Sequence, residues 1–114
     1  MALVVHQVAL DMVVAIKPLI DTIAGHDRAL ADQLRRSASS VALNIGEAAY
    51  SRRGNKTARF SDAAGSAGET RANLQVAVAW GYARRGDAAQ VDVQLDRVLA
   101  MLWRLTHPGS RPAA

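Results

Sequence analysis

Hydrophobic residues recur at intervals of three and four along most of the chain, which is the spacing of one face of an α-helix. In residues 3–24 this stripe consists of Val5, Val8, Met12, Ile16, Leu19 and Ile23. Other apolar residues of the segment fall outside the stripe, among them Leu10, Val13, Val14 and Ile20. A helix that is apolar over more than one face must be covered on more than one side. We therefore expect this helix to contact a second copy of the chain, with Val13 and Val14 at the interface.

Three further helices follow from the same periodicity. The second covers residues 27–50 with Asp27 as its N-cap, and the third covers 56–83. The fourth has Asp87 as its N-cap and stops before Pro108. Four helices of similar length joined by short turns predict an all-α, antiparallel, up-down four-helix bundle. We expect one domain over residues 1–107 and a flexible C-terminal tail over 108–114.

Proline and glycine mark irregular positions in these helices. Pro18 lies inside the first helix, where it removes one backbone hydrogen bond and predicts a kink. Gly65 and Gly68 each lower the helix propensity of the third segment by about 1 kcal/mol relative to Ala. We expect both, together with Gly81, on a packed face where small residues let backbones approach closely.

Polar residues form a second row beside the apolar stripe on the two middle helices. The rows consist of Ser37, Ser40, Asn44 and Glu47, and of Arg59, Asp62, Ser66, Glu69 and Asn73. Such rows are either solvated or form a hydrogen-bonding seam between helices. We predict a seam that contains Asn44, Glu47, Ser66 and Glu69, with Arg36 among their partners.

Composition excludes several classes of function. The chain has no cysteine, so a disulfide framework, a thiolate zinc site and a Cys nucleophile are impossible. No basic region precedes the apolar N-terminal stretch, which Asp11 and Lys17 interrupt. We expect a soluble, cytoplasmic protein without a signal peptide.

Catalytic and metal-binding patterns are missing from the sequence. A di-metal site in a four-helix bundle needs Glu-x-x-His, but neither Glu47 nor Glu69 is followed by a histidine at that spacing. Glu47 and Glu69 could act as an acid/base pair, but pairing with Arg35, Arg36 or Arg71 explains them more simply. We therefore expect no metal, no cofactor and no enzymatic activity.

The net charge of +4 is concentrated in the middle of the chain, where residues 35–71 carry seven basic and three acidic residues. Arg52, Arg53, Lys56 and Arg59 lie within eight residues. Several cations on one surface are what phosphate contacts need. Near this cluster the aromatic residues are Tyr50 and Phe60, so base stacking is not indicated there. Two interpretations stay open: binding of nucleic-acid backbone, RNA or DNA, and a structural or protein-protein adaptor role.

Three stretches together resemble one known family. They are QLRRSA at 33–38 with SVALNIGEA at 40–48, the run from Phe60 through Gly65-Ser66 to Glu69, and the run from Leu74 to Tyr82. Their order and spacing are similar to those of the four-helix-bundle proteins encoded by intervening sequences in the large-subunit ribosomal RNA gene. The accessory protein of diversity-generating retroelements resembles the same family.

The resemblance implies a four-helix protomer in a barrel-like homopentamer. In the retroelement branch it also implies binding to nucleic acid and to a reverse transcriptase. The chain departs from the family pattern at a few positions: Gly46 and Ala48 stand where the family prefers Ala and Gly, Trp80 replaces a usual Leu, and Asp62-Ala63 replaces a bulkier apolar pair.

Overall fold

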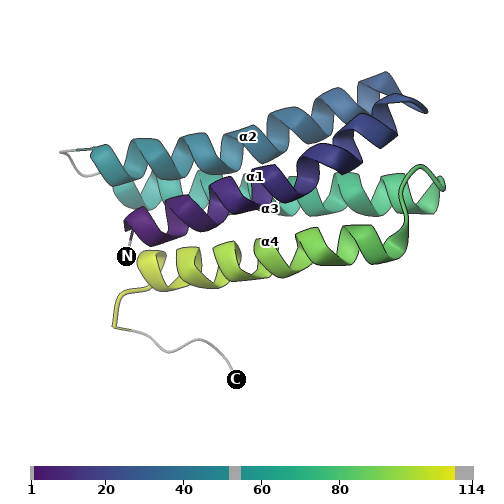
Figure 1. Ribbon diagram of the computed structural model, residues 1–114. Helices are drawn as coiled ribbons and strands as arrows, with labels where there is room; N and C mark the ends of the chain where they lie inside the picture. Colours follow the sequence, from purple (N-terminus) through teal and green to yellow (C-terminus); the bar gives the residue numbers. More distant parts are fainter. Residues whose placement is uncertain (1, 52–54, 110–114) are drawn as a thin grey trace.

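The computed structural model describes residues 2–51 and 55–109 as four helices. They are α1 (Ala2–Ala24), α2 (Arg28–Tyr50), α3 (Lys56–Ala79) and α4 (Arg85–Thr106). α1 and α3 each pack against both α2 and α4, so the helices form an antiparallel bundle, as predicted. The α1–α2 and α3–α4 turns lie at one end, and the start of α1 and the end of α4 lie at the other (Figure 1). Residues 110–114 of the predicted tail lie outside the described residues.

One stripe of each helix faces the common core. All six residues of the stripe predicted for α1 are buried. Their partners from the other helices include the fully buried Leu34, Ile45, Leu74, Leu95 and Leu102. Burying an aliphatic side chain of this size stabilises the fold by roughly 1.5–3 kcal/mol.

The ends of α2 and α3 have identifiable caps. Asp27 is the N-cap of α2, as predicted, because its carboxylate accepts a hydrogen bond of 3.0 Å from the Leu30 amide.

α3 ends at Ala79, earlier than the predicted residue 83. The Gly81 amide donates to the Val78 carbonyl, the Tyr82 amide donates to that of Ala77, and Gly81 has a φ of 79°. This is a Schellman motif, so Gly81 terminates the helix and does not belong to its packed face.

Asp87 is not the N-cap of α4, which corrects our prediction. The extended residue before the helix is Arg84, and its side chain makes no capping hydrogen bond. Asp87 lies in the first turn instead, where a negative charge is stabilised by the positive end of the helix dipole.

The prediction that Gly65 and Gly68 lie on a packed face is wrong. Both are exposed, and a Cβ atom built on either would meet no neighbouring atom within 4 Å. The close approach in this bundle occurs at Gly46, where a Cβ atom would lie 3.3 Å from Nε2 of His6. The departure from the family's Ala at position 46 therefore makes room for a histidine of α1.

Pro18 lies within α1, and the helix bends away from α4 over its C-terminal part (Figure 1). Proline cannot donate to the preceding turn, and its ring clashes with that turn, which is a common cause of a kink. One turn later the Thr22 hydroxyl donates to the Pro18 carbonyl over 3.1 Å.

Candidate nucleic-acid interface and assembly surface

Two residues of the basic cluster predicted to bind nucleic acid, Lys56 and Arg59, lie at the α2–α3 end of the bundle. Lys56 and Arg59 are exposed on the first turn of α3, whereas Arg52 and Arg53 lie outside the described residues. Nε of Arg59 lies 3.2 Å from Oε2 of Glu47, and both side chains are about half exposed. The arginine paired with Glu47 is therefore Arg59, and not Arg35, Arg36 or Arg71, which we had expected. An exposed ion pair of this kind contributes roughly 0–1 kcal/mol, so a phosphate could replace the carboxylate.

A polar seam joins α2 to α3 in the middle of the bundle. The hydroxyl oxygens of Ser40 and Ser66 lie 2.8 Å apart. The Asn44 side-chain amide donates to both the carbonyl and the hydroxyl oxygen of Ser40, each over 3.0 Å. Two of the predicted members, Asn44 and Ser66, are thus connected through Ser40.

The deeper part of the seam contains Thr70, which the sequence analysis missed. Its hydroxyl lies 2.8 Å from the Ser66 carbonyl oxygen and 3.0 Å from Oγ of Ser37, and it can donate to either. Ser37 also donates to the Leu34 carbonyl. The Asn73 side-chain amide lies 3.4 Å from Ser37 Oγ. Ser37, Thr70 and Asn73 are all buried, so their polar atoms depend on one another for hydrogen bonds.

Arg36 and Glu69 flank this seam without joining it. Both are exposed, and together with Gln33, Ser37 and Ser40 they line a surface hollow of about 330 Å³. No hydrogen bond or ion pair joins either of them to the seam residues that the structure describes. Helical geometry explains why. Around the axis of α3, Glu69 is rotated by about 60° from Ser66, whereas Thr70 and Asn73 stay within about 40° of it.

Arg71 connects α3 to α4. Its Nε lies 3.2 Å from Oδ1 of Asp92, and its terminal nitrogen pairs with Asp96. Partial burial acts to lower the pKa of Arg71, but the hydrogen bonds and charges of Asp96 and Asp92 outweigh it and raise the pKa. Arg71 is therefore engaged inside the protomer and is not one of its free surface cations.

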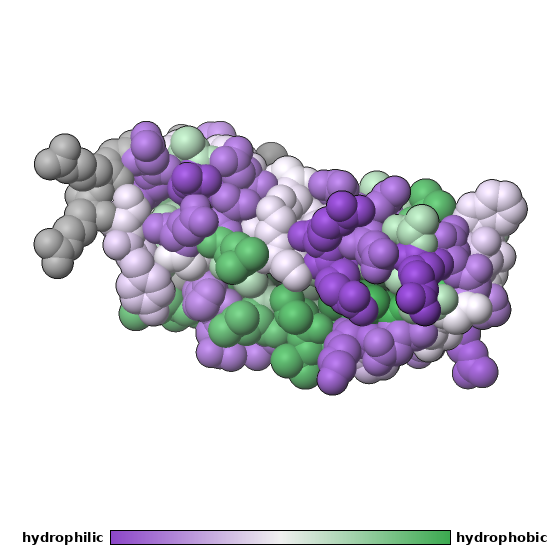
Figure 2. Space-filling view, turned by 90° about the horizontal axis from the view of Figure 1, so that it is seen from above, coloured by the Kyte–Doolittle hydropathy of each residue, from purple (hydrophilic) through white to green (hydrophobic). Residues whose placement is uncertain are grey.

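The outward face of α1 exposes large apolar side chains. Val14 is 73% exposed and Leu3 is 61% exposed, with Val4 and Leu10 on the same helix. Val13 is half-buried against the core and lines a groove of about 350 Å³ between α1 and α2 together with Val14. Seen from above, apolar side chains gather into a patch along one edge of the molecule, beside a largely polar surface (Figure 2).

α1 is also long and apolar enough to cross a membrane, judged by length and composition alone. Residues Leu3–Ala24 have a mean hydropathy of 1.7, and 33% of this stretch is buried in the bundle. A core helix that is covered on two sides has the same composition.

No group of three or more His, Asp or Glu side chains is placed to hold a metal ion within residues 2–51 and 55–109. The described residues thus offer two exposed cations at the start of α3, a polar seam between α2 and α3, and an apolar face on α1.

The fold and these surfaces define a small antiparallel four-helix bundle. The family of 23S rRNA-intervening sequence proteins matches residues 1–104, and the chain belongs to this family. A crystal structure from Bacteroides thetaiotaomicron, of a protein of unknown function in the S23 ribosomal protein family, superposes with a TM-score of 0.83. The two chains are 21% identical over 90% of this chain and 97% of that one, a likeness that shows the fold. Comparison with curated proteins finds no match. These family members are small helical proteins without a known catalytic activity.

Proposed function

We propose that the protein is a non-enzymatic, self-associating helical bundle that binds the backbone of nucleic acid through its α2–α3 turn. The observation that carries the proposal is the outward face of α1, on which Val14 and Leu3 are exposed although the bundle's core is complete. Covering this face with further copies removes apolar surface from water. The homopentamer implied by the family resemblance is the assembly that we propose.

Assembly matters for binding because it repeats the basic turn. One protomer presents Arg52, Arg53, Lys56 and Arg59 within eight residues. Glu47 neutralises part of this charge through Arg59. Repeating the turn around a ring multiplies a modest positive potential into a field that attracts phosphate groups.

The test is retardation of structured RNA and duplex DNA by the full chain over a range of salt concentrations. Replacing the four basic residues of the turn by Ala should weaken binding and make its dependence on salt shallower, because fewer counterions are released. Oligomeric mass should stay unchanged. The matched control replaces four exposed arginines elsewhere, Arg28, Arg35, Arg85 and Arg97, by Ala.

A second candidate function is a structural or protein-protein adaptor. It is favoured by exposed apolar side chains on the other helices, such as Leu43, Val76 and Val93. Absence of binding to RNA and DNA by the parent protein at low salt would favour this role. Equal losses in the turn variant and in its control would place the nucleic-acid site elsewhere.

A further inference from the structure

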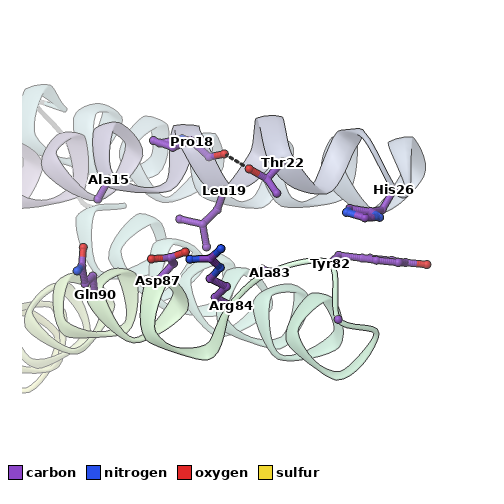
Figure 3. A pocket seen from close by; sticks show the side chains of 11 residues that line it. Ala15, Pro18, Leu19, Thr22, His26, Tyr82, Ala83, Arg84, Asp87 and Gln90 are labelled. Carbon is purple, nitrogen blue, oxygen red and sulfur yellow. Dashed lines mark hydrogen bonds between the residues drawn. The ribbon is translucent and has the colours of Figure 1, made fainter.

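A cleft of about 570 Å³ lies at the end of the bundle opposite the α2–α3 turn. It is bounded by the last turns of α1, the residues that connect α3 to α4, and the first turns of α4 (Figure 3). Pro18 lines it, at the place where α1 bends away from α4. This volume is larger than that of the hollow beside Arg36 or of the α1–α2 groove, and it suits a small-molecule site.

Aromatic rings form one end of the cleft. The rings of His26 and Tyr82 stack with their centroids 5.1 Å apart and an interplanar angle of 11° (Figure 3). Tyr82 also stacks with Trp80 at 6.3 Å and 15°. Of the two rings that line the cleft, His26 is exposed and Tyr82 is half-buried, and the neighbouring Trp80 is 69% exposed. Because these rings already stack on one another, a nucleobase in the cleft would pack against the ring edges of His26 and Tyr82 or the outer face of His26, not between the rings.

The long walls of the cleft differ in polarity. Leu19 of α1 points into the cleft, which Pro18 also lines, and Arg84, Asp87 and Gln90 lie across from it on the side of α4 (Figure 3). The Arg84 guanidinium makes no ion pair with any residue that the structure describes. Its donors can therefore bind a phosphate group.

Charge at the cleft limits the ligand. Arg84 and Asp87 carry opposite charges, so the wall cannot neutralise a highly charged polyphosphate. A carboxylate beside a nucleotide is suited to accept hydrogen bonds from ribose hydroxyls, including the 2′-OH that DNA lacks. The combination of rings, one cation and one carboxylate fits a ribonucleotide with a single phosphate.

We propose that this cleft binds a ribonucleoside monophosphate unit. The base packs against His26 and Tyr82, the phosphate pairs with Arg84, and the 2′-hydroxyl donates to Asp87. The unit is either a free nucleotide or one residue of a single-stranded RNA. This site is independent of the basic α2–α3 turn at the other end of the bundle.

Titration of the full chain with AMP, dAMP, ATP, inorganic phosphate and the pentamer (rA)5 tests the proposal, with heat and tryptophan fluorescence as readouts. AMP or (rA)5 should bind better than dAMP, ATP and phosphate. Binding of AMP alone assigns a free nucleotide, and binding of (rA)5 alone assigns single-stranded RNA. Arg84→Gln should weaken binding about tenfold, and Asp87→Asn should remove the preference for AMP over dAMP.

Arg85→Gln is the control, because Arg85 is exposed one residue away and lines a different groove, between α3 and α4. It should bind as the parent does. Tyr82→Ala should also lower the affinity about tenfold. Its control is Tyr50→Ala, at an exposed position on the opposite end of the bundle, which should bind as the parent does. Replacing the basic α2–α3 turn by Ala should leave AMP binding intact, which separates this site from the proposed function. Failure of the parent to bind either AMP or (rA)5 would overturn the proposal, as would unchanged binding by Arg84→Gln.

Discussion

The outward faces of α1 and α3 differ although the two helices have nearly the same length, 23 and 24 residues. α1 exposes Leu3, Val4 and Val14, whereas the exposed side of α3 includes Gly65, Gly68 and Glu69. Both helices contribute one buried stripe to the same core, so the fold needs nothing from the apolar residues outside the stripe of α1. Apolar residues beyond those that the bundle can cover indicate a further contact, and we assign it to assembly.

The buried faces of α1 and α3 also differ in polarity. The buried residues of α1 are all apolar, whereas α3 buries Thr70 and Asn73 against Ser37 of α2. Hydrogen bonds are directional, so buried hydrogen-bonded side chains select one alignment of two helices more narrowly than apolar contacts do. The α2–α3 pair therefore sets the register of the bundle, and α1 supplies volume.

Val14→Glu should have the largest effect, because it places a charge in the proposed apolar interface. We expect the dissociation constant of the oligomer to rise roughly tenfold or more. The side chain is largely exposed in the protomer, so the fold should remain intact. Sedimentation velocity over a dilution series measures the effect. Val76→Glu on α3 serves as the control, and equal weakening by both variants would show that the α1 face has no special role.

Thr70→Val should destabilise the protein by about 1–3 kcal/mol, because valine keeps nearly the same shape but leaves the buried Ser37 hydroxyl without its partner on Thr70. Chemical denaturation measures the free energy of unfolding. Thr57→Val, at an exposed position of the same helix, should change it little. A Thr70 variant as stable as the parent would mean that the seam does not set the register.

Arg71→Met should lower stability by about 1 kcal/mol, since it removes a partly exposed contact between α3 and the two aspartates of α4. Added salt should shrink the difference between parent and variant, because it screens the parent's ion pairs. The pKa of Arg71 is raised in the folded protein, so its contribution is complete below the ordinary pKa of arginine and is lost only as the pH rises above it. Arg97→Met, at an exposed site, is the control.

Gly65→Ala should have the smallest effect and the opposite sign, a stabilisation of about 0.5–1 kcal/mol, because the site is open and helical. Gly81→Ala should destabilise by roughly 1–2 kcal/mol, because its φ of 79° is unfavourable for a residue with a Cβ atom. Thermal melting of both variants measures the contrast. A destabilising Gly65→Ala would mean that the outward face of α3 is packed against a partner.

The bundle, its core stripes and the Asp27 cap follow from sequence because periodicity and capping are local properties. The end of α3 did not follow from the sequence, because the helical spacing of apolar residues continues through Gly81. Gly81 ends the helix through its left-handed φ, which the spacing does not reveal. On α3 the predicted polar row contained Glu69, whereas the seam contains the next residue, Thr70. Both residues fit three-and-four spacing from Ser66, and only the burial of Thr70 distinguishes them.

Contacts between distant helices and loops were beyond the reach of sequence patterns. Arg71 meets Asp92 and Asp96 because α3 and α4 are antiparallel with a particular rotation about their axes. His26 meets Tyr82 because two turns lie at the same end of the bundle. Of the apolar residues that the sequence placed outside the stripe of α1, Leu10 and Val14 are exposed, whereas Val13 is half-buried and Ile20 lies in the core.

The central claim, that α1 mediates assembly, is tested most directly by the mass of the full chain in solution. Multi-angle light scattering at micromolar concentration should give five times the 12.1 kDa mass of one chain. The Val14→Glu variant should move toward the single-chain mass on dilution while the Val76→Glu variant does not. A parent protein with the mass of one chain at that concentration would contradict the account.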